Sequence, residues 1–255
     1  MSAAECARFE KKLAYFSAPS LLGIKCANLI SIGKNEFNLP EHIHNFNTKA
    51  AKKGLRLHVL CACKSRALIL LYNASALEQQ LKCDEACRIL EAYGYKNAAR
   101  TEEKLKKLAE RIQENPGFPH EIGVFLDYPL GDVIGFIENK GHNYKCKGCW
   151  KVYCNECEAV KLFARYKKCR DVYLRLWQQG RSVLQSIESM YVHYAFSVGA
   201  ISAVTSQFFP AHWCLEYSID GGKTYKICPD IVTGEEYVHL RTLPWWDVNI
   251  SGVKY

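Results

Sequence analysis

Four cysteines in two closely spaced pairs are the residues of this 255-residue chain whose spacing could do chemistry. Each pair has two residues between its thiols, and the four are Cys146, Cys149, Cys154 and Cys157. Two such pairs are typical of a zinc site, because tetrahedral Zn²⁺ binds four thiolates about 2.3 Å away. An iron–sulfur cluster also binds four thiolates. Zinc and iron are therefore the metals to consider here.

The segment between the two pairs argues against one shared metal. It reads Trp150-Lys151-Val152-Tyr153, which predicts a short strand. An extended chain from Cys149 to Cys154 spans roughly 16 Å at about 3.3 Å per residue, whereas the sulfurs around one zinc ion lie within about 4 Å of one another. Three alternatives stay open: a shared metal, a site formed by one pair with ligands from elsewhere, and free thiols. The spacing favours the third.

His120 and Glu121 are the candidate catalytic pair. A histidine beside a carboxylate can work as an acid–base pair or as metal ligands. The pair precedes the apolar run 122–126, which predicts a short buried strand with a glycine where a ligand could approach. Neighbouring residues of a strand point to opposite faces, so a capping or structural role competes with catalysis. His42 and His44, in a polar connector, form a weaker candidate metal pair.

The elements that must position these residues follow from the hydrophobic periodicity. Helical spacing predicts helices over residues 3–16, 21–31, 74–93, 101–114, 131–139 and 157–187, and a connector with one helical turn over 33–47. Two apolar runs at 55–61 and 67–72, joined by a short polar segment of five residues, predict a β-hairpin. The expected fold class is α+β, with a small, mainly antiparallel sheet covered by helices.

The sequence pattern changes after residue 187. β-rich runs follow at 191–198, 213–219, 224–227 and 237–243, and Asp220-Gly221-Gly222 predicts a tight hairpin turn between the second and third. We therefore divide the chain into a domain over residues 1–187 and a β-rich appendage over residues 188–255. The segment 213–222 resembles a strand–turn unit of extracellular β-sandwich modules, many of which bind carbohydrate, and this resemblance implies a partial β-sandwich.

Cysteine usage and charge bear on compartment and partners. The 13 cysteines are irregularly spaced, and no signal-like stretch or run of 18 apolar residues occurs, so we expect free thiols in the cytoplasm and no membrane insertion. The net charge of +8 divides into +11 for residues 1–187 and −3 for 188–255. The basic side of the predicted helix 157–187 is a candidate surface for nucleic acid or another polyanion, with a solvated face as the competing interpretation. Its basic residues are Lys161, Arg165, Lys167, Lys168 and Arg175.

Three stretches of residues 1–187 resemble DUF3793, a family of unknown function found mostly in anaerobic Firmicutes. They run over residues 18–29, over 118–137, and over 148–153 with Tyr166-Lys167-Lys168-Cys169. The resemblance implies a role in iron or redox physiology, with a redox or iron-transport protein as partner. Three residues depart from the family pattern, which commonly has cysteine at the position of Ser17 and other residues at the positions of Cys154 and Cys157.

Three hypotheses of function follow. The first is a non-enzymatic cytoplasmic accessory protein, linked to iron or redox homeostasis through a ligand or partner. The second is an enzyme that uses His120 and Glu121, and the third is a polyanion-binding protein that uses the basic helix 157–187. The sequence contains no phosphate-binding glycine loop, nucleophile elbow or metalloprotease helix, so it matches none of the enzyme classes that these motifs identify.

Overall fold

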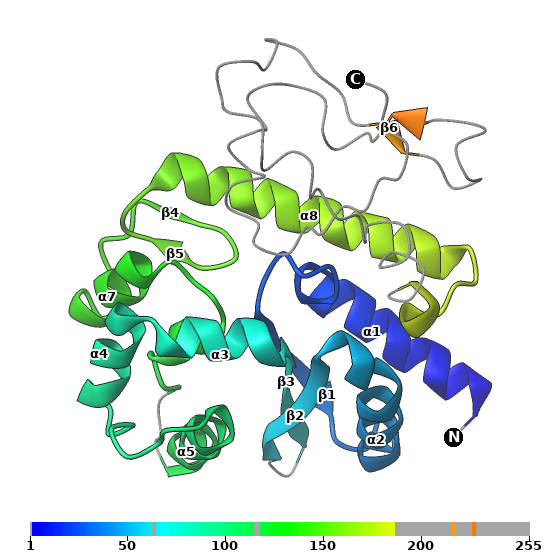
Figure 1. The fold of residues 1–255 in the computed structure, drawn as a ribbon, viewed down its shortest axis with the longest axis horizontal. Helices are drawn as coiled ribbons and strands as arrows, with labels where there is room; N and C mark the ends of the chain where they lie inside the picture. Colours follow the sequence, from blue (N-terminus) through cyan, green and yellow to red (C-terminus); the bar gives the residue numbers. More distant parts are fainter. Residues whose placement is uncertain (1, 63–64, 115–117, 187–215, 218–225, 228–255) are drawn as a thin grey trace. The chain divides into compact units, whose positions relative to one another are not determined.

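A computed structural model describes residues 2–62, 65–114, 118–186, 216–217 and 226–227 of the chain. The chain divides into two compact units, residues 1–187 and residues 188–255. The first unit is a mixture of helices and small antiparallel sheets, which confirms the expected α+β class (Figure 1). In the described part of the chain, no helix combines the length and the apolar character that crossing a membrane would require.

The centre of the first unit is a three-stranded antiparallel sheet with the order β1-β3-β2. Its strands are β1 (Ala27–Gly33), β2 (Leu55–Ala62) and β3 (Arg66–Asn73). The predicted hairpin is confirmed, since β2 pairs with β3 and Leu57 lies opposite Leu71. The central strand is apolar on both faces, as a strand covered on both sides must be.

The strand β1 corrects the expected helix over residues 21–31. Residues Ala27–Gly33 pair instead with β3, and Ile30 lies opposite Ile69. The preceding helix α1 (Ala3–Leu21) is also longer than predicted, because Pro19 is accommodated in its last turn. The apolar residues of 27–33 fit the periodicity of a helix or of a strand, because the run is short. Pairing with the apolar strand β3 stabilises the strand conformation.

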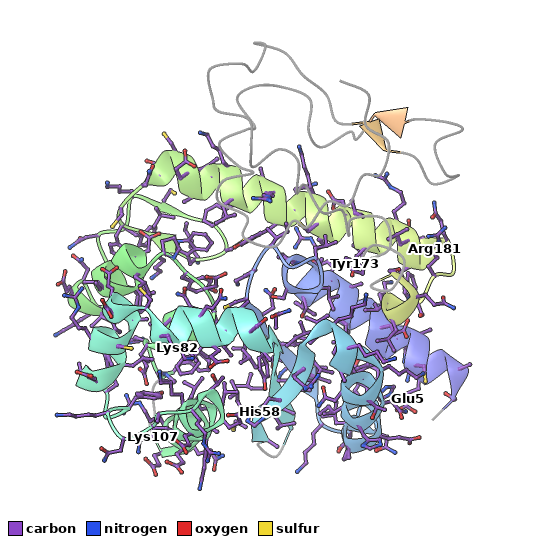
Figure 2. The ribbon with its side chains drawn as sticks, in the orientation of Figure 1. Glu5, His58, Lys82, Lys107, Tyr173 and Arg181 are labelled. Carbon is purple, nitrogen blue, oxygen red and sulfur yellow. The ribbon has the colours of Figure 1, made fainter. Side chains whose placement is uncertain are left out.

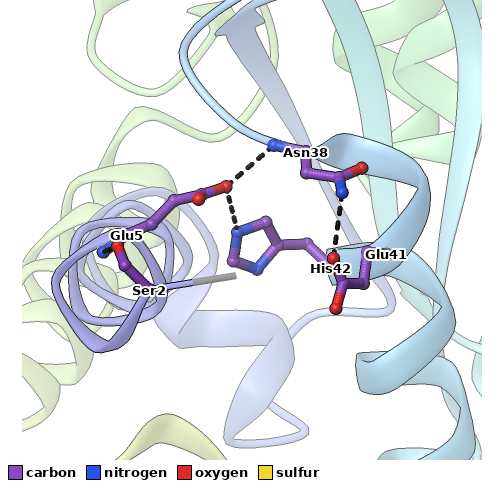
Figure 3. A network of polar contacts seen from close by, with 5 residues as sticks. All are labelled: Ser2, Glu5, Asn38, Glu41 and His42. Carbon is purple, nitrogen blue, oxygen red and sulfur yellow. Dashed lines mark hydrogen bonds and ion pairs between the residues drawn. The ribbon is translucent and has the colours of Figure 1, made fainter.

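The helix α2 (Leu39–Ala50) replaces the expected connector and is followed by the short 3₁₀ helix η1 (Ala51–Lys53). Its position is fixed against α1 by Glu5, whose Oε1 accepts hydrogen bonds from the amide of Asn38 at 2.8 Å and pairs with Nε2 of His42 at 3.1 Å (Figure 3). The ring of Phe9 stacks on His42 at 4.2 Å between centroids. His42 therefore serves packing between two helices.

The helices α3 (Ala74–Lys82) and α4 (Asp84–Ala92) replace the single helix expected over residues 74–93. The chain is extended at Cys83, with ψ at 135°, and this residue separates the two helices. The helix α5 (Thr101–Glu114) begins where the sequence predicts, and the carboxylate of Glu103 accepts hydrogen bonds from the amides of Ala99 and Arg100. The main apolar core lies between the sheet and the helices α3 to α7.

The expected buried strand over residues 122–126 is wrong. Its residues form the short helix α6 (Ile122–Phe125), all four of which are buried. A short apolar run without polar alternation fits a buried helix as well as a buried strand, and the turn that begins at Pro119 selects the helix. The predicted helix after it is confirmed as α7 (Leu130–Glu138).

The last part of the first unit is a small hairpin followed by a long helix. The strands β4 (Cys146–Lys147) and β5 (Lys151–Val152) pair antiparallel, in agreement with the strand expected between the cysteine pairs. The helix α8 (Glu156–Gln178) is capped by Asn155, whose side chain accepts a hydrogen bond from the amide of Glu158, and it ends at Gln178 rather than at the predicted residue 187. It is the longest helix among the described residues and packs along α1 (Figure 1).

The second unit is described at two short strands, β6 (Glu216–Tyr217) and β7 (Lys226–Ile227). They pair antiparallel, with Glu216 opposite Ile227, which agrees with the hairpin predicted around Asp220-Gly221-Gly222. That turn and the β-rich runs at 191–198 and 237–243 lie outside the described residues, as does most of the segment that resembles a β-sandwich module.

Candidate functional site

Lys25 is a buried lysine in the turn between α1 and β1. Its amide and that of Ile24 both donate to the carbonyl of Pro19, at 3.2 and 2.8 Å. Gly23, with φ at 69°, makes this reversal possible, because a left-handed backbone suits glycine at the end of a helix. The C-terminal turn of α1 thus places the lysine in the interior, where only 5% of it is exposed.

The ammonium group of Lys25 is held by aromatic rings. Its Nζ lies 4.8 Å from the ring centroid of Tyr128 and 5.7 Å from that of Tyr166. Within the described residues it makes no hydrogen bond and no ion pair. A cation over a ring face gains about 0.5–2 kcal/mol, which offsets part of the cost of leaving water. Burial lowers the pKa of Lys25 to about 8, although the nearby carboxylate of Asp127 acts in the opposite direction.

Asp127 is the carboxylate beside this lysine. It follows α6 in a left-handed conformation with φ at 58°, which aspartate tolerates better than most residues. Its Oδ2 accepts a hydrogen bond from the amide of Cys26 at 2.9 Å. Burial raises the pKa of Asp127, while the Cys26 amide and the charge of Lys25 act to lower it. Lys25, Asp127, Tyr128 and Tyr166 together are called the Lys25 site below.

A cavity of about 310 Å³ opens at the Lys25 site. Its lining combines aromatic rings and aliphatic side chains with one carboxylate and one amide, from Ile24, Gln80, Asp127, Tyr128, Pro129, Leu130, Leu162 and Tyr166. Such a cavity suits a small organic molecule, because apolar walls provide affinity and a few polar groups fix orientation.

The hairpin β4–β5 forms one side of the Lys25 site. Trp150 stacks on Tyr128 with 5.1 Å between ring centroids, and the Tyr128 hydroxyl donates weakly to the carbonyl of Cys149 at 3.4 Å. Asp132, which is buried, holds the hairpin by accepting hydrogen bonds from Nε1 of Trp150 and from the amides of Tyr153 and Cys154, at 2.7, 2.7 and 2.8 Å. The hydrogen bonds to Asp132 and the stacking of Trp150 on Tyr128 therefore fix the hairpin beside the Lys25 site.

The comparison with protein families agrees with the resemblance in the sequence. The model of a family described as "Protein of unknown function (DUF3793)" matches residues 13–187, which is more than half of the chain. The chain belongs to the DUF3793 family. No curated protein and no solved structure matches the chain.

The three stretches that carry the DUF3793 resemblance meet at the Lys25 site. Lys25 lies in the first stretch, Tyr128 in the second, and Trp150 and Tyr166 in the third. Sequence reasoning missed this site, because a lysine after a helix is ordinarily exposed and nothing in its own neighbourhood signals burial. The sequence did contain one signal for this site. The three stretches that resemble the family are far apart in the sequence, and each contains polar or aromatic residues that could form a common site.

The four cysteines of the two candidate pairs lie around the hairpin β4–β5 and the start of α8. Cys149, Cys154 and Cys157 are exposed and Cys146 is half-buried. Among the residues that the structure describes, no three or more cysteine, histidine or acidic side chains come together as metal ligands. Burial raises the pKa of the Cys149 thiol, whereas the charges of Lys25 and Arg170 act to lower it. The zinc and iron alternatives thus find no preformed ligand set in this part of the chain.

His120 and Glu121 lie in different surroundings. His120 is exposed and its ring packs edge-on against Phe136 at 5.0 Å. Glu121 is fully buried, where its Oε1 accepts hydrogen bonds from Nε of Arg111 and, at 3.2 Å, from the hydroxyl of Tyr95. Neither residue lines the cavity of the Lys25 site. The geometry gives Glu121 a structural ion pair and leaves His120 on the surface.

The basic side of α8 is partly paired within the helix. Lys161 forms an ion pair with Glu158 at 2.9 Å, and Lys167 forms one with Asp171 at 2.7 Å. The guanidinium of Arg170 lies over the ring of Tyr15. The two ion pairs neutralise part of the positive face that a polyanion would bind, and they fit a solvated helix surface.

Proposed function

We propose that this protein is a non-enzymatic accessory protein of the cytoplasm that binds a small, flat organic ligand at the Lys25 site and so serves iron or redox homeostasis. The observation that carries the proposal is the cavity of about 310 Å³ at the point where the three family stretches meet. The association with iron or redox physiology comes from the family resemblance. The cytoplasmic location is favoured by the cysteines, of which all ten in the described residues are free thiols.

The lining of the cavity indicates the chemistry of the ligand. The rings of Tyr128 and Tyr166 offer faces on which a flat molecule can stack, and Ile24, Leu130 and Leu162 supply aliphatic walls. Asp127 is a hydrogen-bond acceptor in the cavity, so the ligand should present an N–H or O–H group to it. Lys25 keeps a positive charge close to Asp127, which favours the ionised carboxylate.

The experiment is to purify the full chain without oxygen, measure bound iron, zinc and haem, and follow thermal unfolding with ferrous iron, zinc or haemin added. Riboflavin, a flat molecule whose ring N–H group can donate to Asp127, is the fourth additive, and we expect it to raise the unfolding midpoint. Asp127→Asn removes the charge and retains both a side-chain acceptor and tolerance of the left-handed backbone. This variant should lose most of the shift, whereas Asp171→Asn on the exposed side of α8 should keep it.

Protein without bound cofactor, together with an unchanged midpoint for all four additives, would argue strongly against the proposal. Equal shifts in the wild type and Asp127→Asn would move the binding away from the Lys25 site. The enzyme hypothesis for His120 and Glu121 and the polyanion hypothesis for the basic side of α8 stay predictions. The polyanion hypothesis would be favoured if the protein bound nucleic acid and the logarithm of its affinity fell linearly with the logarithm of the salt concentration.

A further inference from the structure

A second cavity, of about 420 Å³, lies between α3 and the start of α5, near the end of β3. Lys82 on α3 and Lys107 on α5 mark the two helices that border it (Figure 2). Its lining is polar and charged, from Tyr72, Ala74, Glu78, Leu81, Lys82, Ala99, Arg100, Thr101, Glu102 and Lys104. None of these residues belongs to the Lys25 site, so this cavity calls for a separate explanation.

Lys104 brings a buried ammonium group to this cavity. The residue is 9% exposed, and its Nζ donates to the carbonyl of Leu81 at 2.7 Å. This bond satisfies one of the last carbonyl groups of α3, which is the structural role of the lysine. An ammonium has three donors, and within the described residues no carboxylate forms an ion pair with this one. The ammonium group of Lys104 therefore keeps its positive charge and further N–H donors for a ligand in the cavity.

Tyr72 adds a second buried donor. The residue is 8% exposed and lines the cavity, and its hydroxyl has no hydrogen-bond partner among the residues that the structure describes. The hydroxyl itself is not one of the fully enclosed polar atoms, so it is accessible from the cavity, where a ligand oxygen could accept its proton. The hydroxyl is therefore a group that points to a ligand independently of the lysine.

The first turn of α5 supplies further donors. The amides of Thr101, Glu102 and Glu103 make no hydrogen bond within the described part of the chain, whereas those of Ala99 and Arg100 are bound by Glu103. Free amides and the helix dipole make the start of a long helix favourable for negative charge. Thr101 and Glu102 both line the cavity.

We propose that the cavity between α3 and α5 binds the oxyanion group, a carboxylate or a phosphate, of a small metabolite. Lys104, Tyr72 and the first amides of α5 would donate to its oxygens. Of the two carboxylates in the lining, Glu78 is already paired with Lys82 at 2.6 Å. Glu102 is exposed, so water and salt screen its repulsion of the ligand.

The test uses the full chain with inorganic phosphate and acetate as separate probes, followed by the NMR amide signals of Thr101 and Glu102. We expect saturable shifts of both signals with at least one probe, and the tighter probe identifies the oxyanion. Tyr72→Phe should weaken that binding about tenfold, the effect of one hydrogen bond to a charged acceptor. It removes a hydroxyl that makes no hydrogen bond within the described residues, so the fold should be unchanged. Tyr144→Phe, outside the cavity lining, should bind as the wild type does.

Glu102→Gln provides the complementary test. For a simple oxyanion this change removes a repulsion, so binding should tighten about twofold, as expected for an exposed charge. A ligand that also carries an ammonium group would instead lose affinity, and glycine would then bind more tightly than acetate. That result would support the proposal and identify the ligand as an amino acid bound through its carboxylate, whereas equal binding by the wild type and Tyr72→Phe would overturn it. The absence of amide shifts with phosphate and acetate at tens of millimolar would overturn it as well.

Discussion

Two buried charges in the first unit, Glu121 and Lys25, are accommodated in different ways. Glu121 is fully buried and meets an opposite charge, Arg111, together with the hydroxyl of Tyr95. Lys25 is 5% exposed and meets ring faces, with Asp127 near enough to affect its pKa but not paired with it in the described structure. One charge is neutralised within the protein, and the other is only partly compensated.

The difference separates a structural group from a candidate binding group. The Glu121 carboxylate is paired with a guanidinium, and this ion pair holds α5 against the segment before α6, although its Oε2 has no hydrogen-bond partner among the described residues. A buried ammonium over two tyrosine rings keeps its donors unused while two of its neighbours line a cavity. Such partial compensation is expected at binding sites rather than in a packed core.

The largest expected effect comes from breaking the Glu121 pair. Arg111→Met would leave the carboxylate buried without its cation, so we expect the free energy of unfolding to fall by about 3 kcal/mol. Urea denaturation measures it. Arg88→Met, on the exposed side of α4, is the control and should change stability by less than about 0.5 kcal/mol. Glu121→Gln added to Arg111→Met should restore part of the loss, and if it restores none, the pair is not what stabilises this region.

The next effect is a pH dependence that belongs to Lys25. The folded lysine loses its proton at a pKa of about 8, whereas the unfolded lysine keeps it up to the ordinary lysine pKa of 10.5. The unfolded chain therefore binds more protons between these values, and the free energy of unfolding rises with pH through this window. We expect Lys25→Met to lack about 1–2 kcal/mol of the rise between pH 8 and 9.5. A wild-type-minus-variant difference that stays constant with pH would mean that Lys25 is not buried as a cation.

The fold could be predicted from the sequence where a periodic pattern is long or where a turn joins two matching runs. The hairpin β2–β3, the helix α7 and the start of α5 follow from such local patterns. The strand β1 and the helix α6 could not be predicted, because a short apolar run fits either element. Their conformations depend on distant partners, such as the pairing of Ile30 with Ile69.

The Lys25 site lay beyond local patterns for the same reason. The amide of Cys26 and the carboxylate of Asp127 are 101 residues apart in the sequence and bonded in the fold. His120 and Glu121, which the sequence predicted as a catalytic pair, are neighbours in sequence but occupy different surroundings. The family resemblance contained the information that spacing lacked, since its three stretches converge where the cavity lies.

A smaller effect is expected at Ser17, a buried polar group without charge. Its hydroxyl is fully buried in α1 and has no partner in the described residues. Ser17→Cys replaces it by a less polar group, the one common in the family, so we expect about 1 kcal/mol of added stability. Ser20→Cys is the matched control, because the equally buried Ser20 hydroxyl donates to Asn28 at 2.7 Å and its loss should destabilise. Equal effects of the two changes would show that hydrogen bonding does not distinguish these positions.

The smallest effect is expected from removing residues 188–255. The described partners of Lys25 and Glu121 lie within residues 1–187. The first unit and the family match both end at residue 187. A fragment of residues 1–187 should therefore unfold cooperatively within about 0.5 kcal/mol of the full chain, the size of a change that removes no buried contact. It should also retain the stability increase between pH 8 and 9.5, because Lys25 keeps its surroundings. Aggregation of the fragment would mean instead that residues 188–255 complete the core, and the contrast between Lys25 and Glu121 would then have to be drawn for the whole chain.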